Sequence, residues 1–316
     1  MNRALVCGVA GQDGAYLAKL LLDKGYQVIG NSRDAQAARF ENLARLGIRD
    51  RVTLETMDPE DPQAVAATLR KWSPQELYNL SGQSSVGLSF ERPAETFRSI
   101  AVATLNLLEA VRAHGEPIRF FNASSSECFG DVASGLADEH TPFRPRSPYA
   151  AAKAAAHWQV ANYRDAYRLY ACNGILFQHE SPLRPERFVT RKITAAARRI
   201  AQGSGERLSL GNLAIRRDWG WAPEYVDAMW RMLQQDAPED LVLATGTLAS
   251  LEDFVAAAFA AAGLDWHAHV SFDPALARAA DVPGFAGDAR RAAGRLGWRA
   301  SVRMPEVARL MLENER

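Results

Sequence analysis

Short apolar runs alternate with amphipathic segments along the first half of the chain. The runs predict strands over residues 4–7, 27–31, 52–56, 76–80 and 119–122. Apolar positions at helical spacing lie between them and predict helices over residues 15–24, 35–46, 62–71 and 96–114. Strands that alternate with helices are typical of right-handed βαβ units, so we expect a parallel sheet covered by helices on both faces.

The pattern loosens after residue 123. A turn-rich stretch over residues 130–148 precedes a predicted helix at 149–167 and a strand at 172–177. Beyond these, the chain predicts helices over 188–201, 223–235, 250–262 and 304–314, and strands over 241–244 and 270–272. We therefore expect an α/β protein with a Rossmann-type, doubly wound parallel sheet in residues 1–177. Residues 178–316 are expected to form mainly a smaller, mixed lobe, from which segments such as 241–244 return to the main sheet.

Composition narrows the possible functions. In 316 residues, 37 Lys and Arg balance 37 Asp and Glu, which argues against a nucleic-acid partner and an anionic membrane surface. The three cysteines, Cys7, Cys128 and Cys172, are scattered and have no zinc-ligand spacing, so neither a disulfide framework nor a metal site is expected. With no apolar run of membrane-spanning length and no apparent leader, the chain is expected to be cytoplasmic.

A glycine-rich turn joins the first strand to the first helix. Gly8, Gly11 and Gly14 have the spacing G-x-x-G-x-x-G. Glycines at such a turn let the backbone approach a pyrophosphate, which the N-terminus of the following helix attracts. A strand-to-helix turn without a ligand is the alternative, but the position after the first strand of a βαβ series favours dinucleotide binding.

The end of the second strand bears on the choice of dinucleotide. An acidic residue there accepts a hydrogen bond from the ribose 2′-hydroxyl of NAD, whereas arginine accommodates the 2′-phosphate of NADP. Ser32 is not acidic and Arg33 follows it, which favours NADP. NAD stays possible because Asp34 could approach a 2′-hydroxyl; a surface pair between Arg33 and Asp34 is the structural alternative.

Two further motifs carry candidate chemistry. Tyr149 and Lys153 are four residues apart and share a helix face, where the cation favours the phenolate. Ser125 and Glu127 follow the strand at 119–122, on the side of a parallel sheet where ligands bind. A serine can hydrogen-bond a substrate oxygen and a carboxylate can act as acid and base; alternatively, both side chains cap the following turn.

At these residues the chain resembles the extended short-chain dehydrogenases/reductases that modify nucleotide sugars, and most of all the GDP-mannose 4,6-dehydratase family. The resemblance covers nearly the whole chain. It is carried, in order, by the segments GVAGQDGAYLAKLLLDKGY, ELYNLSGQSSV, SPYAAAKAAAHW, YACNGILFQHESPLR, FVTRKIT, LGNLAIRRDWG and LGW.

The resemblance implies NADP-dependent dehydration of GDP-mannose to GDP-4-keto-6-deoxymannose, with catalytic residues Ser125, Glu127, Tyr149 and Lys153. Tyr149 would take the proton of the C4 hydroxyl while hydride passes from C4 to NADP⁺. Glu127 would then remove the C5 proton and assist departure of the C6 hydroxyl as water, before hydride returns to C6. Ser125, which stands where the family has a threonine, would hydrogen-bond the C4 oxygen, and Lys153 would hold the phenolate and the ribose.

Binding residues are carried over from the same resemblance. The positions that match cofactor contacts are Gly8, Gly11, Gln12, Asp13, Gly14, Arg33, Asp58, Leu80, Gln83, Tyr149, Lys153, His179 and Arg184. The positions expected to bind the nucleotide sugar are Ser84, Gln178, Glu180, Lys192, Arg217 and Arg278. A homodimer or homotetramer is also implied.

Some positions depart from the family pattern. Gln178 replaces an asparagine, Pro185 a glycine, and Asp281 and Pro283 stand where the family has longer acidic or polar residues. These changes leave open a different hexose, heptose or nucleotide, and a related dehydratase, epimerase or reductase is the alternative function. A non-catalytic NADP-binding protein is less consistent with the presence of both Tyr149 and Lys153 beside Glu127.

Overall fold

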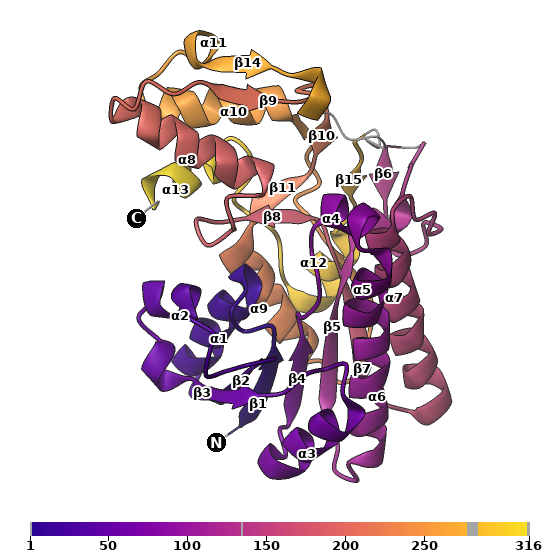
Figure 1. Ribbon diagram of the computed structural model, residues 1–316. Helices are drawn as coiled ribbons and strands as arrows, with labels where there is room; N and C mark the ends of the chain where they lie inside the picture. The colour runs from indigo at the N-terminus through magenta and orange to yellow at the C-terminus, as the bar shows by residue number, and fades with distance from the viewer. Residues whose placement is uncertain (1, 134, 277–283, 315–316) are drawn as a thin grey trace. The chain divides into compact units, whose positions relative to one another are not determined.

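The computed structural model describes residues 2–133, 135–276 and 284–314, which form two compact units (Figure 1). Unit 1 comprises residues 1–130, 142–176 and 226–241, and unit 2 comprises residues 131–141, 177–225 and 242–316. Arg278, Asp281 and Pro283 lie outside the described residues.

Unit 1 is built from strands that alternate with helices. Its elements are β1 (Arg3–Cys7), α1 (Gln12–Asp23), β2 (Gln27–Ser32), α2 (Glu41–Arg45), β3 (Thr53–Thr56), α3 (Pro62–Trp72), β4 (Glu76–Asn79), α4 (Val86–Glu91), α5 (Pro93–Phe97), α6 (Ala103–Ala113), β5 (Arg119–Ser125), α7 (Pro148–Tyr167) and β7 (Ala171–Leu176). Two elements, α9 (Ala222–Met232) and β12 (Leu241–Leu243), have residues in both units.

The main sheet has seven strands in the order β12-β7-β5-β4-β1-β2-β3, and the pairings β5–β7, β4–β5, β1–β4, β1–β2 and β2–β3 are parallel. The chain runs outward from β1 to β3 and then returns to β4, so the strand order reverses between β1 and β4. In Figure 1, α3, α6 and α7 cover one face of the sheet and α1 lies against the other. The expected doubly wound α/β fold is confirmed; ligands of such sheets bind where the order reverses.

Unit 2 combines helices with short strand pairs. Its elements are β6 (Leu136–Ala137), β8 (Gln178–Glu180), α8 (Val189–Ala201), β9 (Leu208–Leu210), β10 (Arg216–Arg217), β11 (Trp219–Trp221), β13 (Ala249–Ser250), α10 (Leu251–Ala261), α11 (Trp266–His269), β14 (Val270–Phe272), β15 (Ala286–Gly287), α12 (Arg290–Leu296) and α13 (Glu306–Glu313). Strands β8–β11, β9–β14 and β6–β15 pair in parallel, and β10–β13 pair antiparallel.

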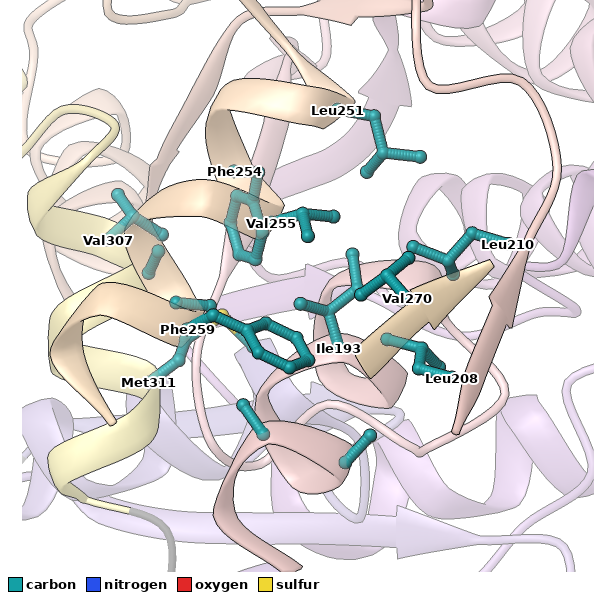
Figure 2. Close-up of a cluster of buried hydrophobic side chains, with 14 of the residues drawn as sticks. Ile193, Leu208, Leu210, Leu251, Phe254, Val255, Phe259, Val270, Val307 and Met311 are labelled. Atoms are coloured by element: carbon teal, nitrogen blue, oxygen red, sulfur yellow. The ribbon is translucent and has the colours of Figure 1, made fainter. Parts of the chain in front are cut away.

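The core of unit 2 lies between three helices and one of these strand pairs. Phe254 and Phe259 of α10 pack with Ile193 of α8, Met311 of α13 and Leu208 of β9 (Figure 2). Helix α10 begins with a capping box, in which the Ser250 hydroxyl accepts from the backbone N–H of Asp253 while the Asp253 carboxylate accepts from the N–H of Ser250.

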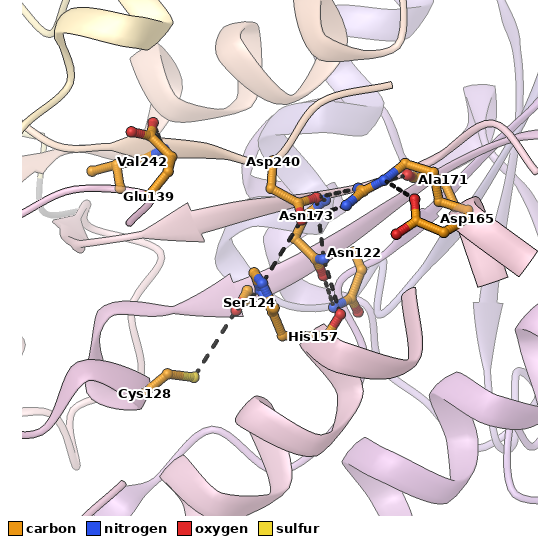
Figure 3. Close-up of polar contacts among 11 residues, drawn as sticks. Asn122, Ser124, Cys128, Glu139, His157, Asp165, Ala171, Asn173, Asp240 and Val242 are labelled. Atoms are coloured by element: carbon orange, nitrogen blue, oxygen red, sulfur yellow. Dashed lines mark hydrogen bonds and ion pairs between the residues drawn. The ribbon is translucent and has the colours of Figure 1, made fainter. Parts of the chain in front are cut away.

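Three buried asparagines cross the main sheet in one row. Asn79, Asn122 and Asn173 are register partners on β4, β5 and β7. The Asn79 amide donates to Asn122 Oδ1 at 3.1 Å. The Asn122 amide donates to Asn173 Oδ1 at 2.9 Å, and Figure 3 shows this second pair. Because buried polar groups are stabilised only when they are paired, this row favours one register of the central strands.

The predicted elements differ from the observed ones mainly at helix ends. The helix predicted over residues 35–46 is confined to α2. The Asp34 carboxylate accepts from the N–H groups of Gln36 and Ala37, both at 3.0 Å, as a helix N-cap does, but only one turn follows it. Phe40, with φ of 50°, interrupts a right-handed helix after that turn. The helix predicted at 96–114 contains a π-helical turn at Arg98–Val102.

Replacing the central asparagine tests the row. Asn122→Leu removes both bonds and leaves the Asn79 amide and the Asn173 carbonyl oxygen with unmet partners, so we expect the free energy of unfolding to fall by about 2–4 kcal/mol in urea titrations. Asn106→Leu is the control: the Asn106 side chain also makes two hydrogen bonds, both donated by its amide to the carbonyls of Pro59 and Glu60, but it is only half-buried. A loss for Asn122→Leu no larger than for the control would contradict the role of the row.

Candidate active site in unit 1 and binding residues in unit 2

Three candidate segments follow neighbouring strands of the main sheet. Gly8 follows β1, Leu80 follows β4 and Ser125 ends β5, and the sheet order places these strands side by side as β5-β4-β1. The backbone N–H of Leu80 donates to the Cys7 carbonyl at 3.0 Å, which extends the β1–β4 pairing to the strand ends. The fold therefore brings the glycine turn and the Ser125–Glu127 segment to the same edge of the sheet.

The glycine turn has no room for side chains. Gly8 has φ of +84°, and a Cβ atom there would lie 2.7 Å from the Leu80 carbonyl oxygen. A Cβ atom at Gly14 would lie 2.3 Å from the Gly8 carbonyl oxygen. Gly11, which has no side chain, occupies the N-cap of α1. This tight backbone at a helix N-terminus fits a phosphate group.

Asn31 supports this turn, a role that sequence analysis missed. Its side-chain oxygen accepts from the N–H of Gly8 at 3.2 Å, and its amide donates to the Met57 carbonyl at 2.8 Å. Asn31 is 3% exposed, so the only signal in the sequence was a polar residue at the end of an apolar run. Its contacts with Gly8 and Met57 depend on tertiary structure.

Arg33 and Asp34 have different environments at the end of β2. Both side chains are exposed, but the Asp34 carboxylate accepts hydrogen bonds from the N–H groups of Gln36 and Ala37. Within the described part of the chain, Arg33 makes no ion pair. The surface pair considered from the sequence is therefore wrong, and Arg33 is available to an anionic group.

The first turns of α7 carry the Tyr–Lys pair. The Ser147 hydroxyl accepts from the N–H of Ala150 at 3.1 Å, and Pro148 is the first helical residue. This start places Tyr149 and Lys153 in successive turns on one face, with the Lys153 ammonium 6.0 Å from the centre of the Tyr149 ring. Tyr149 packs against Ile100, Ala152 and Ala156.

Lys153 is the buried cation of this site. Its Nζ donates to the Ala123 carbonyl of β5 at 2.7 Å, which joins α7 to the strand that ends at Ser125. Burial lowers the pKa of Lys153 to about 8, although the negative charge of Asp13 acts in the opposite direction. The influence of Asp13 links Lys153 to the first turn of α1, where the glycine motif ends.

Ser125 caps a short 3-10 helix, Ser126–Phe129, to which Glu127 belongs. The Ser125 hydroxyl accepts from the N–H of Glu127 at 3.2 Å, so Ser125 has the capping role considered as an alternative. Accepting this bond does not consume the hydroxyl hydrogen, which can be donated to a ligand. The Glu127 side chain is half-buried, whereas Ser125 is 8% exposed.

The remaining candidates of unit 1 are held by local bonds. The Gln83 amide donates to the Ser85 carbonyl and to the Thr96 hydroxyl, at 2.8 and 3.1 Å. The Asp58 carboxylate accepts from the N–H of Glu60 at 3.0 Å. Ser84, between these bonded neighbours, is exposed.

In unit 2, two candidates are bonded to each other. The Arg184 guanidinium donates to both oxygens of the Glu180 carboxylate, at 2.9 and 3.2 Å, and Thr190 donates to the same carboxylate at 2.8 Å. His179 stacks on the Tyr225 ring with centroids 4.5 Å apart, and its Nδ1 lies 2.6 Å from the Phe177 carbonyl oxygen. These contacts fix the segment that follows β7.

The other candidates of unit 2 are less enclosed. The Lys192 ammonium donates to the Ser209 carbonyl at 2.8 Å, and an Arg217 N–H donates to the Arg216 carbonyl at 2.8 Å. Gln178 is half-buried in β8, and Pro185 is exposed.

Sequence comparison identifies the family. A model of the family described as GDP-mannose 4,6 dehydratase matches residues 5–311. The chain belongs to the GDP-mannose 4,6-dehydratase family. It is 44% identical to GDP-mannose 4,6 dehydratase 1 of Arabidopsis thaliana, over 99% of this chain and 89% of the relative. It is 45% identical to the GDP-mannose 4,6-dehydratase of Sinorhizobium fredii strain HH103, over 99% and 96% of the two chains.

Structural comparison agrees with this assignment. The UDP-glucose 4-epimerase of Thermus thermophilus, solved as a complex with NAD, superposes with a TM-score of 0.87. It is 26% identical, and the match covers 99% of each chain. The resemblance inferred from the sequence motifs is thus confirmed. Among the described residues, every helix is too short or too polar to traverse a lipid bilayer.

The burial of Lys153 predicts a pH-dependent stability. Between its lowered pKa of about 8 and the ordinary value of 10.5, the unfolded chain binds more protons than the folded one, so stability rises with pH across this range. Relative to Lys153→Met, the wild-type protein should gain up to about 3 kcal/mol between pH 8 and 10.5. Urea titrations of both proteins at pH 7 to 10.5 measure this difference; a constant difference would contradict the assignment.

Proposed function

We propose that this protein dehydrates GDP-mannose to GDP-4-keto-6-deoxymannose, with NADP as cofactor. The observation that carries the proposal is the joining of β5 and α7 through Lys153 and the Ala123 carbonyl. This bond holds α7, which bears Tyr149 and Lys153, against β5, which ends at Ser125 and leads directly into the short helix of Glu127. The family assignment supplies the substrate, since relatives of 40–45% identity over nearly the whole chain are named for this reaction.

The cofactor would be bound by unit 1. The glycine turn at Gly8, Gly11 and Gly14, with Gln12 and Asp13 in the first turn of α1, fits a pyrophosphate, and a Cβ atom at Gly8 or Gly14 would collide with backbone. Arg33 would pair with the 2′-phosphate of NADP, as no acidic side chain competes for it among the described residues. We assign Asp58 to the adenine side and Leu80 and Gln83 to positions beside the cofactor. His179 and Arg184 of unit 2 complete the proposed set.

Bound nicotinamide would supply the redox chemistry, accepting hydride from C4 of the sugar and returning it to C6. Tyr149 Oη takes the proton of the C4 hydroxyl as the C4 ketone forms. Lys153, whose buried ammonium is directed by the Ala123 carbonyl, favours the phenolate form of Tyr149. Ser125 donates a hydrogen bond to the C4 oxygen.

Glu127 then carries the elimination. A ketone at C4 acidifies the C5–H bond, and the Glu127 carboxylate takes this proton. As the C5–C6 double bond forms, the C6–O bond breaks, and the proton that Glu127 took from C5 is delivered to the leaving hydroxyl to give water. When hydride returns to C6, C5 needs a proton, and the Tyr149 hydroxyl, protonated in the first step, would supply it. The role requires a carboxylate with access to ligand, and the half-buried side chain of Glu127 meets this requirement better than a fully buried one.

Unit 2 would contribute most contacts to the nucleotide sugar. We propose Gln178 and Glu180 near the sugar, with Ser84 of unit 1, and Lys192 and Arg217 at the diphosphate, where charge-assisted hydrogen bonds are strong. Arg278, assigned to the same group from the sequence, lies outside the described residues. In functional terms, residues 1–177 would bind the cofactor and carry the catalytic groups, and residues 178–316 would mainly bind the substrate.

Two substitutions separate the oxidation from the elimination. With GDP-mannose and NADP⁺, Glu127→Gln should reduce the bound cofactor, seen as near-ultraviolet absorbance of the dihydronicotinamide, but should form no 4-keto-6-deoxy product. Tyr149→Phe should form neither. Exposed Glu116→Gln is the control and should keep wild-type turnover. Product formation by Glu127→Gln at the wild-type rate would remove Glu127 from the elimination, whereas a wild-type protein that forms no 4-keto-6-deoxy product would favour an epimerase or reductase.

The cofactor assignment has its own test. Removing the 2′-phosphate contact by Arg33→Ser should raise the Kd for NADP⁺ about 10- to 100-fold, the range expected for a charge-assisted hydrogen bond. The Kd for NAD⁺ should stay within about twofold, because NAD⁺ lacks this phosphate. Arg39→Ser, at another exposed arginine, serves as control. Equal loss of affinity for both nucleotides would mean that Arg33 does not select NADP.

A further inference from the structure

A buried serine, histidine and aspartate lie in contact inside unit 1, and the proposed chemistry uses none of them. Ser124 Oγ lies 3.2 Å from His157 Nδ1, and His157 Nε2 lies 3.7 Å from the Asp240 carboxylate (Figure 3). Ser124 is 3% exposed and His157 is 5% exposed. Because a nucleophile must meet its substrate, this burial argues against a hydrolytic triad and for an internal role.

The position of each member suggests that role. Ser124 directly precedes Ser125 on β5, and successive side chains of a strand point to opposite faces. His157 is four residues beyond Lys153, so both lie on one face of α7 and both bond to the end of β5. Lys153 bonds to the Ala123 carbonyl, and His157 contacts the next residue.

The imidazole also contacts the chain that connects Glu127 to Tyr149. Phe143, in the segment between them, meets the His157 ring edge-on with centroids 4.7 Å apart. Phe143 in turn meets Phe129 at 5.2 Å, and Phe129 belongs to the same short helix as Glu127. His157 thus contacts β5 directly and the Glu127 helix through one intervening ring.

The charges around His157 favour one state of its ring. Two guanidinium nitrogens of Arg164 donate to the Asp240 carboxylate at 2.7 and 3.0 Å, and the Asn173 N–H donates to it at 2.7 Å. Burial lowers the pKa of His157, with Arg164 acting in the same direction and Asp240 against it, so the imidazole is neutral near pH 7. Asp240 favours the hydrogen on Nε2, which leaves Nδ1 to accept from the Ser124 hydroxyl.

We propose that His157 is a positioning residue, held by Asp240, that fixes the end of β5 against α7 and thereby keeps Ser125 and Glu127 in place for the reaction. This inference rests on the proposed function for its effect on turnover. It does not rest on that function for its effect on structure, because the contacts exist in the free protein.

The test compares His157→Phe, Ser124→Ala and the double variant with wild type. Phenylalanine retains a ring against Phe143 but lacks the nitrogen that Ser124 contacts, and Ser124→Ala removes only the hydroxyl. We expect kcat for GDP-mannose dehydration to fall about 10- to 100-fold in each single variant, the scale of a small misplacement of catalytic groups. KM and the Kd for NADP⁺ should change less than twofold, because the glycine turn is not involved. Ser124→Thr, which restores a hydroxyl, should recover most of kcat.

Coupling between the two residues gives the second readout. Because both substitutions break one contact, the double variant should be no slower than the slower single variant. His114→Phe is the matched control. His114 is another partly enclosed imidazole of unit 1, and its Nε2 has no hydrogen-bond partner among the described residues, so turnover should persist. Multiplicative losses in the double variant, or equal changes in KM and kcat, would overturn the proposal.

Amide hydrogen exchange of the free protein keeps this test independent of the substrate. Residues 124–130 should exchange at least about tenfold faster in His157→Phe and Ser124→Ala, while residues 8–14 and the His114→Phe control match wild type. Unchanged exchange at 124–130 would also overturn the proposal. If wild type fails to dehydrate GDP-mannose but the exchange result holds, the proposed function is wrong and the positioning of β5 by His157 stands.

Discussion

Pairing of buried polar groups is the constraint on which unit 1 depends. A parallel sheet covered on both faces excludes water, yet its central strands carry asparagines, and α7 places an ammonium against the end of β5. Each of these groups is tolerable only because a partner is present at hydrogen-bond distance. The pairs therefore determine how the strands align and where α7 lies. They thereby also determine the positions of Ser125 at the end of β5 and Tyr149 on α7.

The same constraint explains how one end of the sheet can both bind a phosphate through its backbone and present catalytic side chains. In the proposed function, the backbone after β1 comes close to a phosphate. The turn there consists largely of glycines, and the Asn31 side chain stabilises it by accepting a hydrogen bond from the N–H of Gly8. At β5 the chain must present side chains, so it continues from Ser125 into a short helix that carries Glu127. The hydrogen bond from Lys153 to the Ala123 carbonyl joins β5 to α7, which carries Tyr149. Burial that lowers the pKa of Lys153 also makes its ammonium sensitive to nearby anions.

Unit 2 uses its buried charges differently. Glu180 and Arg184 neutralise each other beside Thr190, which secures the segment after β8. Lys192 and Arg217 are only partly enclosed and bond to backbone carbonyls. Their assignment to the diphosphate rests on the family resemblance and on the strength of charge-assisted hydrogen bonds to phosphate.

The sequence alone determined the alternation of strands and helices, the glycine turn after β1 and the placement of Tyr149 and Lys153 on one helix face. These features follow from local periodicity and steric rules, which a short window of residues contains. It misjudged the segment after Arg33, where left-handed Phe40 separates a single turn at Asp34 from α2. Tertiary structure alone decided that Asn31 supports Gly8 and that His157 joins Ser124 to Asp240. Residues far apart in the chain meet only after several elements have packed, and no local pattern encodes which buried polar group will find which partner.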